Sequence, residues 1–344
     1  MSSCPLPISN PESILLAHGG GGALTQRLLE RVILPRFRNP ALDQAHDGAV
    51  LAVPAGSLAF STDGHVVRPL EFPGGNIGTL AVHGTINDLA MCGARPLWLA
   101  AGLILEEGLS IELLERILDS MAAACADAGV ELVTGDTKVV ERGHGDGIFI
   151  TTSGIGSVVA PHPVGPRHLQ VGDAILLSGD LGRHGIAILA ARERLGFDGV
   201  PDSDCAPLFR PVLDLLARGI TVHCLRDLTR GGLAAALHEI ASTSGHGVWI
   251  DESRIPVCGP VRSACELLGL DPLHVANEGR FVAFVPECEV AQALDVLSGH
   301  EVSRRAVRIG TVTRRAAAPV LLETVTGATR VLPYLSGEQL PRIC

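Results

Sequence analysis

The stretch that decides the fold of the first half of the chain is residues 72–91, Phe-Pro-Gly-Gly-Asn-Ile-Gly-Thr-Leu-Ala-Val-His-Gly-Thr-Ile-Asn-Asp-Leu-Ala-Met. Its apolar positions, among them Ile77, Leu80 and Leu89, recur at helical spacing, and Gly93 follows the last of them. The pattern therefore predicts a helix from about Ile77 to Met91. The dipole and the free backbone N–H groups at the start of such a helix favour a phosphate group.

Further elements are predicted on both sides of this helix. Upstream, the pattern indicates a helix over residues 25–32 and a hairpin over 49–67, where two apolar runs flank Pro-Ala-Gly-Ser. Downstream, it indicates a strand over 96–105, a helix from a Ser110 cap to Gly129, a strand from Val130 that breaks at 134–138, and a strand over 147–158.

The second half repeats this mixture after a proline-rich linker at residues 161–166. The predicted strands are 173–178, 221–225, 247–250, 274–285 and 305–313, and helices are expected at 184–195, 207–217 and 232–242, with two more further on. Because two halves of similar size lack a strict βαβ order, we expect an α+β fold with two domains, each a mixed sheet with helices. The predicted limits are a glycine-rich segment (1–40), a first domain (41–160), a second domain (168–325) and a flexible tail (326–344).

Of the 344 residues, 47% are hydrophobic, only 3% are aromatic, and 40 are glycine. This composition favours an α/β or α+β enzyme with an aliphatic core and many tight turns. A formal charge of −10 without a basic patch argues against nucleic acid or an anionic membrane surface as the main partner. The sequence shows neither a signal segment nor about 18 consecutive apolar residues. Nine scattered cysteines without a CxxC pair indicate a reducing compartment. We therefore expect a cytoplasmic protein.

The last ten residues, Leu-Ser-Gly-Glu-Gln-Leu-Pro-Arg-Ile-Cys, have no helical or alternating period. They suggest a flexible arm that carries the thiol of Cys344 to a site elsewhere on the molecule, where its thiolate would be the nucleophile. The alternative is that the terminal cysteine has no function.

Three acidic residues, Asp63, Asp88 and Asp136, fall at predicted strand or helix ends near glycine. Carboxylates from several loops suit Mg²⁺ together with the phosphate oxygens of ATP. Each alone is better explained as a turn or capping residue. With Gly74, Gly75 and Asn76 at a helix start, the set favours a metal–nucleotide site.

Other polar and glycine-rich stretches leave two interpretations open. The four glycines Gly19, Gly20, Gly21 and Gly22 offer bare N–H groups to a phosphate, or form a plain loop. Lys138 and Glu278 lie between apolar stretches, where a shifted pKa would suit acid–base chemistry, although a surface ion pair is the simpler interpretation. The segment around Arg230 either holds an anion or caps a helix.

Six stretches form a recognisable set: 72–78 (Phe-Pro-Gly-Gly-Asn-Ile-Gly), 83–90 (His-Gly-Thr-Ile-Asn-Asp-Leu-Ala), 135–140 (Gly-Asp-Thr-Lys-Val-Val), 229–232 (Thr-Arg-Gly-Gly), 277–279 (Asn-Glu-Gly) and 341–344 (Pro-Arg-Ile-Cys). The set resembles the HypE family of hydrogenase maturation factors, in the aminoimidazole ribonucleotide synthetase-like (PurM-like) superfamily. The internal motifs are shared with selenophosphate synthetase and thiamine-monophosphate kinase, whereas the terminal motif singles out HypE.

The resemblance implies an ATP-dependent carbamoyl dehydratase. In that family a carboxamide placed on the C-terminal thiol by the carbamoyltransferase HypF is dehydrated to a thiocyanate, whose cyanide goes to the iron of a [NiFe]-hydrogenase precursor held by HypC and HypD. The resemblance also implies a homodimer formed through the first domain, with ATP near the interface.

By that likeness Cys344 is the carrier, and Lys138 and Glu278 activate and deprotonate the thiocarboxamide, in an order the sequence leaves open. Magnesium is assigned to Asp63, Asp88 and Asp136. The implied ATP contacts are Gly19, Gly20, Gly21, Gly22, Gly74, Gly75, Asn76, Asn87, Asp88, Thr137 and Arg230.

The chain departs from the expected family pattern at Gly64, Thr79 and His83. Two other functions stay open. One is a superfamily kinase or synthetase for a free small molecule, in which the tail is incidental. The other is a non-catalytic binding protein whose terminal thiol holds a metal or docks a partner.

Overall fold

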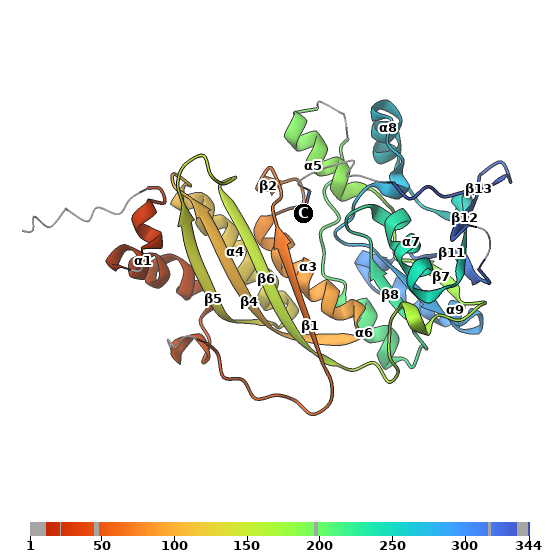
Figure 1. Cartoon of the computed structure of the whole chain (residues 1–344), viewed down its shortest axis with the longest axis horizontal. Coiled ribbons are helices and arrows are strands. Elements are labelled where there is room, and N and C mark those ends of the chain that lie inside the picture. The colour runs from red at the N-terminus through yellow and green to blue at the C-terminus, as the bar shows by residue number, and fades with distance from the viewer. Residues whose placement is uncertain (1–11, 21, 45–47, 196–198, 316–317, 336–342) are drawn as a thin grey trace, which may run out of the picture.

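The computed structural model describes residues 12–20, 22–44, 48–195, 199–315, 318–335 and 343–344 (Figure 1). Two domains lie side by side, each with its own sheet and helices, and the marked C-terminus lies between them. The predicted α+β architecture of two domains is confirmed.

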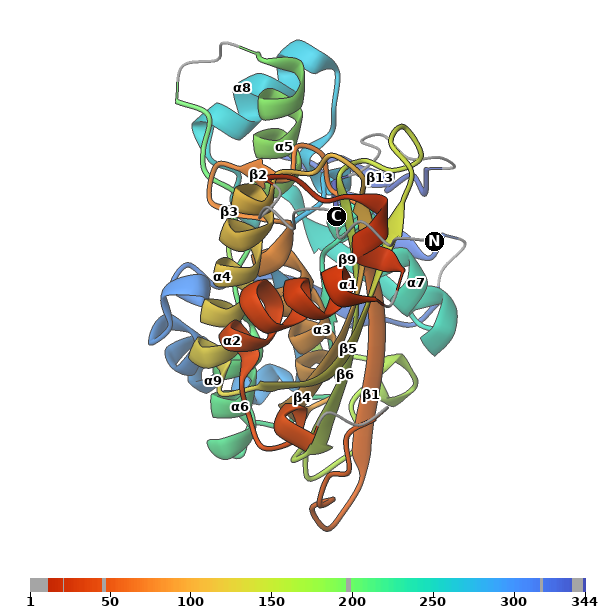
Figure 2. The same cartoon turned by 90° about the vertical axis from the view of Figure 1, so that its left-hand side faces the viewer.

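The first domain contains a four-stranded sheet of order β1-β6-β4-β5. Its strands are β1 (Leu58–His65), β4 (Ala94–Glu106), β5 (Glu131–Val140) and β6 (Ile148–Val158). The helices α3 (Ile77–Met91) and α4 (Ile111–Ala128) lie on one side of this sheet, as Figure 2 shows. On the other face, which we call the outer face, Leu58, Phe60 and Ile104 are exposed.

The helix predicted over residues 25–32 is part of a longer helical stretch. α1 (Ala23–Leu28), a π-helical turn (Leu29–Ile33) and α2 (Leu34–Phe37) follow one another directly, after a 3₁₀ helix at Leu16–Gly19. Pro35 at the start of α2 has no N–H to donate to the preceding turn, which accounts for the wider π-helical turn before it.

Two predictions in the first domain were wrong. The hairpin at 49–67 does not form, because only its second apolar run becomes a strand, β1, which pairs with β6. In the first run Val50 and Val53 are exposed and the backbone is irregular. The break predicted at 134–138 is also absent, since a register shift against β4 between Leu99 and Ala100 lets β5 continue to Val140.

The second domain has a seven-stranded mixed sheet of order β13-β12-β9-β11-β7-β10-β8. Its strands are β7 (Ala174–Leu177), β8 (Cys224–Asp227), β9 (Gly247–Asp251), β10 (Phe281–Val285), β11 (Val307–Thr313), β12 (Val320–Glu323) and β13 (Thr329–Val331). The described helices are α5 (Arg183–Glu193), α6 (Phe209–Ala217), α7 (Gly232–Ser244), α8 (Gly259–Leu268) and α9 (Val290–Ser298).

Three boundaries in this domain differ from those predicted. The strand at 221–225 lies later, at Cys224–Asp227. The strand at 274–285 is shortened to Phe281–Val285, because residues 275–280 form a loop in which a Cβ on Gly279 would lie 1.8 Å from the carbonyl oxygen of Asp204. The tail begins later than residue 326, since β13 pairs with β12.

Helix α3 packs between the two domains. Ile77, Leu80 and Leu89 are fully buried. The helix packs on β1 and β6 of its own domain and also on α6 and β8 of the second domain. Each such side chain contributes roughly 1.5–3 kcal/mol by leaving water. Among the described helices, none has both the length and the apolar character needed to cross a bilayer.

Candidate active site

The start of α3 is closed by its own side chains. Asn76 Oδ1 accepts hydrogen bonds from the N–H groups of Gly78 (2.9 Å) and Thr79 (3.1 Å), and Thr79 Oγ1 in turn accepts from Asn76 N–H (3.0 Å). Thr79, one of the departures from the family pattern, thus completes a reciprocal cap. Gly74 has φ +89° and abuts the second domain, since a Cβ there would lie 2.8 Å from Ser203 N. Gly74 therefore lies at the domain junction, whereas Asn76 and Thr79 satisfy the first N–H groups of α3.

Four carboxyl groups gather where the domains meet, and we call them the acidic cluster: Asp63 on β1, Asp88 on α3, Asp227 at the end of β8 and Glu278 in the loop before β10. Burial and the charges of Asp88 and Asp63 raise the pKa of Asp227 to about 7, against the opposing charge of Arg226. Burial, opposed by a hydrogen bond from Ser61 Oγ (2.6 Å), also raises the pKa of Asp88.

Glu278 is the most perturbed member of the acidic cluster. Burial, followed by the charges of Asp227, Asp204, Asp63 and Asp88, raises its pKa well above the usual value. Its Oε1 atom is buried and has no hydrogen-bond partner among the described residues. A buried carboxyl group with a raised pKa can act in proton transfer.

The oxygen donors of the acidic cluster suit a hard cation such as Mg²⁺, and the orphaned Glu278 oxygen fits a site that needs a positive partner. Within the described part of a single chain, however, no three His, Cys, Asp or Glu side chains are close enough to hold a metal ion.

Asp136 and Lys138 lie away from the acidic cluster. Lys138 Nζ is 2.7 Å from Asp136 Oδ2, and both side chains are about two-thirds exposed. In the register with β4, Asp136 pairs with Gly102 and Lys138 with Ile104, which places both on the outer face. Asp63 pairs with buried Thr152 on β6, which places it on the opposite face. Two strands separate β5 from β1, a distance of about 14 Å. One chain therefore does not bring Lys138 to Glu278.

The glycine segment lies beside β5. A Cβ on Gly19 would be 2.8 Å from Val139 N, so the 3₁₀ helix can approach the strand only because glycine stands there. A mostly apolar cavity of about 340 Å³ lies between α1, α2 and β5, with Asp136 and Thr137 in its lining. Gly20 follows Gly19 directly and Gly22 comes just before α1, while Gly21 lies outside the described residues.

Asn87 lies buried at the domain junction, whereas Arg230 is exposed. Asn87 is buried and bridges to the start of α6, donating to Ala206 O (3.1 Å) and accepting from Leu208 N–H (2.7 Å). Both ends of its amide are therefore committed to the domain junction. Arg230 is exposed in the turn that precedes α7.

The last two residues are held at the junction from both domains (Figure 1). His184 Nε2 on α5 donates to the Ile343 carbonyl (2.5 Å), and Val66 N–H, just after β1, donates to a carboxylate oxygen of Cys344 (3.1 Å). Ile343 is buried and Cys344 is half-buried. Val66 directly follows His65, whose Nε2 lies 3.7 Å from Asp63 Oδ2. The terminus is therefore docked beside the acidic cluster.

The tail is also fixed where it leaves the second sheet. His238 Nε2 on α7 donates to the buried Leu332 carbonyl (2.9 Å), and the Tyr334 ring stacks on His238 at 4.9 Å. Residues 336–342, in the middle of the predicted flexible arm at 335–344, lie outside the described residues. From Tyr334 to Ile343 the chain can span at most about 32 Å.

Family models match both domains. Residues 45–158 match the AIR synthase related protein, N-terminal domain, and residues 170–320 match the C-terminal domain. Carbamoyl dehydratase HypE of Azotobacter vinelandii is 50% identical over 332 residues, which cover 96% of this chain and 97% of that protein. This chain belongs to the HypE family. The HypE of Cupriavidus necator is 52% identical over 330 residues, covering 96% and 94%.

Solved HypE structures share the whole fold. A crystal structure of hydrogenase maturation protein HypE in complex with ATP aligns with a TM-score of 0.93 at 46% identity, covering 96% of this chain and 99% of that one. A HypE–HypF complex aligns with a TM-score of 0.78 at 43% identity, covering 91% and 99%. The predicted PurM-like architecture and carbamoyl dehydratase class are confirmed.

Sequence reasoning missed Asp227, His184 and Val66. Asp227 lies in the segment around Arg230, whose two arginines suggest either an anion site or a helix cap. His184 lies between Arg183 and Gly185 at the start of a predicted helix and shows no local sign that it binds the chain terminus 159 residues away.

Proposed function

We propose that this HypE-family chain dehydrates a carboxamide carried on the thiol of Cys344 to a thiocyanate, with ATP, and so supplies the cyanide ligand for the iron of [NiFe]-hydrogenase. The observation that carries the proposal is the docking of Ile343 and Cys344 between the domains, beside the acidic cluster. An incidental tail has no reason to be held by hydrogen bonds from both domains. Docking places the carried group beside the acid–base residues, so the reaction needs no bimolecular encounter with a free substrate.

The chemistry requires the amide oxygen to leave, and that oxygen is a poor leaving group. Transfer of the γ-phosphoryl group of ATP to it turns the leaving group into phosphate, and loss of both nitrogen protons then forms the C≡N bond. Overall, the thiocarboxamide and ATP give the thiocyanate, ADP and phosphate. Glu278 is the proposed proton acceptor in the chain's own junction, because its buried carboxyl has a raised pKa and an orphaned oxygen.

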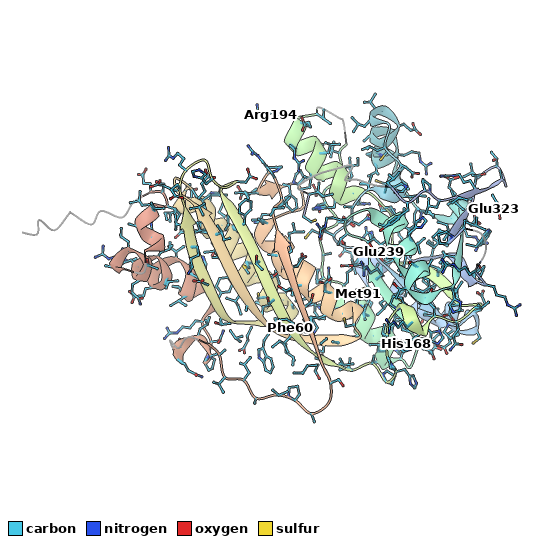
Figure 3. All side chains as sticks on the ribbon, viewed as in Figure 1. Phe60, Met91, His168, Arg194, Glu239 and Glu323 are labelled. Atoms are coloured by element: carbon cyan, nitrogen blue, oxygen red, sulfur yellow. The ribbon has the colours of Figure 1, made fainter. Side chains whose placement is uncertain are left out.

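We propose that Asp136 and Lys138 act from a second copy of the chain. The outer face carries exposed Leu58, Phe60 (labelled in Figure 3) and Ile104, beside Asp136 and Lys138. Two such sheets packed face to face would stand about 10 Å apart. That spacing is short enough for the Lys138 side chain to reach the outer face of the second copy. Lys138 is the only lysine in the chain, so no other ammonium group can replace it.

The proposed nucleotide site combines two clusters. The glycine segment, Thr137 and the apolar cavity beside β5 form the first. The acidic cluster and the α3 start form the second. When bound, Mg²⁺ would neutralise phosphate charge, and Asp63, Asp88 and Asp136 are the proposed ligands. Asp227 adds a further carboxylate to the acidic cluster, beside Asp63 and Asp88.

The proposed partners follow from the family. A solved HypE–HypF complex resembles this chain, and we propose that HypF loads the carboxamide onto Cys344 and that HypC and HypD accept the cyanide in the cytoplasm. The tail must then leave its dock between the two steps, and its two described anchor points suit such a movement.

The test compares Cys344→Ala with Cys288→Ala, which removes an exposed cysteine far from the tail in sequence. ADP release is measured with HypF, carbamoyl phosphate and ATP. The proposal predicts that Cys344→Ala abolishes the carboxamide-dependent ADP signal and Cys288→Ala preserves it. Equal ADP release from both variants would instead favour a kinase for a free small molecule.

A further inference from the structure

A second cavity, of about 630 Å³, lies in the second domain. Its walls are the loop between β7 and α5, the segment 203–207, the first turn of α6 and the segment 300–305. Five arginines line it: Arg183, Arg210, Arg280, Arg304 and Arg305. In a chain with a formal charge of −10, this concentration of guanidinium groups is unusual.

Asp180 orients two of these arginines. Its Oδ1 accepts from Arg280 Nη2 (2.7 Å), and its Oδ2 accepts from Arg183 Nε (2.6 Å). Burial alone would raise the pKa of Asp180, but these two partners hold that pKa below its usual value, so the carboxylate stays charged. Arg280 is further fixed by the carbonyls of Asp180, Gly279 and Val302.

Cationic donors remain available in the cavity. Arg183 uses only Nε in its bond to Asp180, and the guanidinium groups of Arg304 and Arg305 form no hydrogen bond or ion pair with any residue in the described ranges. The acidic groups in the lining are Asp180, Asp204 and Glu301. His300 is paired with Asp214, and Arg210 with Asp127. The lining therefore has a surplus of positive charge.

We propose that this cavity binds a small phosphate-bearing anion. Several guanidinium forks around one space match the oxygens of a phosphate dianion, and Arg183 is already oriented for such contacts by Asp180. The volume is sufficient for a ligand as large as a nucleotide. Ala206, Pro207, Pro211 and Val302 supply an apolar wall for the rest of such a molecule.

The cavity and the tail dock share a wall. Ser203 Oγ lies 2.8 Å from His184 Nδ1, on the ring that holds Ile343. Asp204 Oδ1 accepts from the N–H groups of His184 (3.1 Å) and Glu278 (3.3 Å). A ligand in the cavity would therefore contact the segment that carries these groups, while staying outside the acidic cluster. The binding claim stands independently of the proposed reaction.

Binding is measured by isothermal titration calorimetry with inorganic phosphate and, separately, with AMP, on the full chain. The test variant is Arg304→Ala with Arg305→Ala. The matched control is Arg314→Ala with Arg315→Ala, an adjacent exposed pair outside the cavity that carries the same charge. A third variant, Asp88→Asn, reports binding at the acidic cluster.

The proposal predicts that phosphate or AMP binds the wild-type chain and that the 304/305 variant binds at least about tenfold more weakly, since charge-assisted hydrogen bonds are lost. The 314/315 control should bind as the wild type does. If AMP binds more tightly and phosphate displaces it, the ligand is a nucleotide. If phosphate and AMP bind with equal affinity, the ligand is free phosphate.

Three results would overturn the inference: no binding of either probe to the wild-type chain, equal weakening in both arginine pairs, or binding that depends on Asp88 alone. Arg183→Met provides a second variant at the cavity, since it keeps most of the side-chain volume and removes the oriented guanidinium. It should weaken binding in the same direction.

Discussion

Replacing Asp227 with asparagine should stabilise the folded chain in a pH-dependent way. The side chain keeps its shape but can no longer ionise among Asp88, Asp63 and Glu278. The pKa of Asp227 is about 7 in the folded chain, against an ordinary value of 3.8. Each pH unit between these two values costs about 1.4 kcal/mol, so ionising Asp227 costs the folded chain up to about 4 kcal/mol more than the unfolded chain.

The direction of the effect follows from the raised pKa. Below about pH 4 the carboxyl is protonated in both states, so wild type and Asp227→Asn should be similarly stable. Between pH 4 and pH 7 the wild type progressively loses stability from this group, and above pH 7 the loss is complete. The variant should therefore exceed the wild type in free energy of unfolding at pH 8, by an amount approaching the 4 kcal/mol limit.

The assay is urea denaturation at pH 4.5 and at pH 8. Asp43→Asn is the control, because Asp43 is an exposed carboxylate whose partner is Arg38 (3.2 Å), and its replacement should change stability by about 0.5 kcal/mol or less. Added Mg²⁺ and ATP should narrow the gap at pH 8, since cation binding offsets the repulsion in the wild type. A variant less stable than the wild type at pH 8, or a difference equal at both pH values, would refute the electrostatic account of the cluster.

Other predictions concern the dimer and the tail. Lys138→Ala and Glu278→Gln should each lower ADP release by about 10²-fold or more when assayed alone. Mixing the two variants should restore up to about a quarter of wild-type ADP release. Half of the dimers in a random mixture contain one chain of each variant, and each such dimer has one intact site of two. No recovery after subunit exchange would contradict a site shared between copies. Phe60→Asp should shift the chain to monomers in light scattering, whereas Val325→Asp, at a comparably exposed position (69% and 70%), should leave the mass unchanged. One glycine added after Cys344 should weaken tail docking up to roughly tenfold, because the charged oxygen that accepts from Val66 N–H becomes a neutral peptide carbonyl. Faster labelling of Cys344 by a thiol reagent measures this, and an unchanged labelling rate would count against the dock.

Local chemistry made some elements predictable. The start of α3 at Asn76 and the span of α4 from its Ser110 cap to Gly129 follow from capping residues and helical spacing, and both appear as predicted. The hairpin at 49–67 failed because a strand needs a partner, and β1 pairs with β6 rather than with the segment near Val50. Strand pairing is decided by residues far apart in the chain.

The site was predictable as a set of residues but not as an arrangement. Asp63 and Asp136 look alike in sequence, each beside a glycine on a strand, yet the register of each strand places them on opposite faces of the sheet. A one-residue shift, such as the one at Leu99, reverses which face a side chain takes. The dock for Cys344 depends on His184 and Val66, which no short motif connects to the tail.

The most direct test is intact mass spectrometry of the chain incubated with HypF, carbamoyl phosphate and ATP, alongside Cys344→Ala. The account predicts a gain of about 43 Da for the carboxamide that falls to about 25 Da for the thiocyanate when ATP is present, mapped to Cys344. A mass that never changes, or that changes equally in Cys344→Ala, would contradict dehydration on the chain's own terminus.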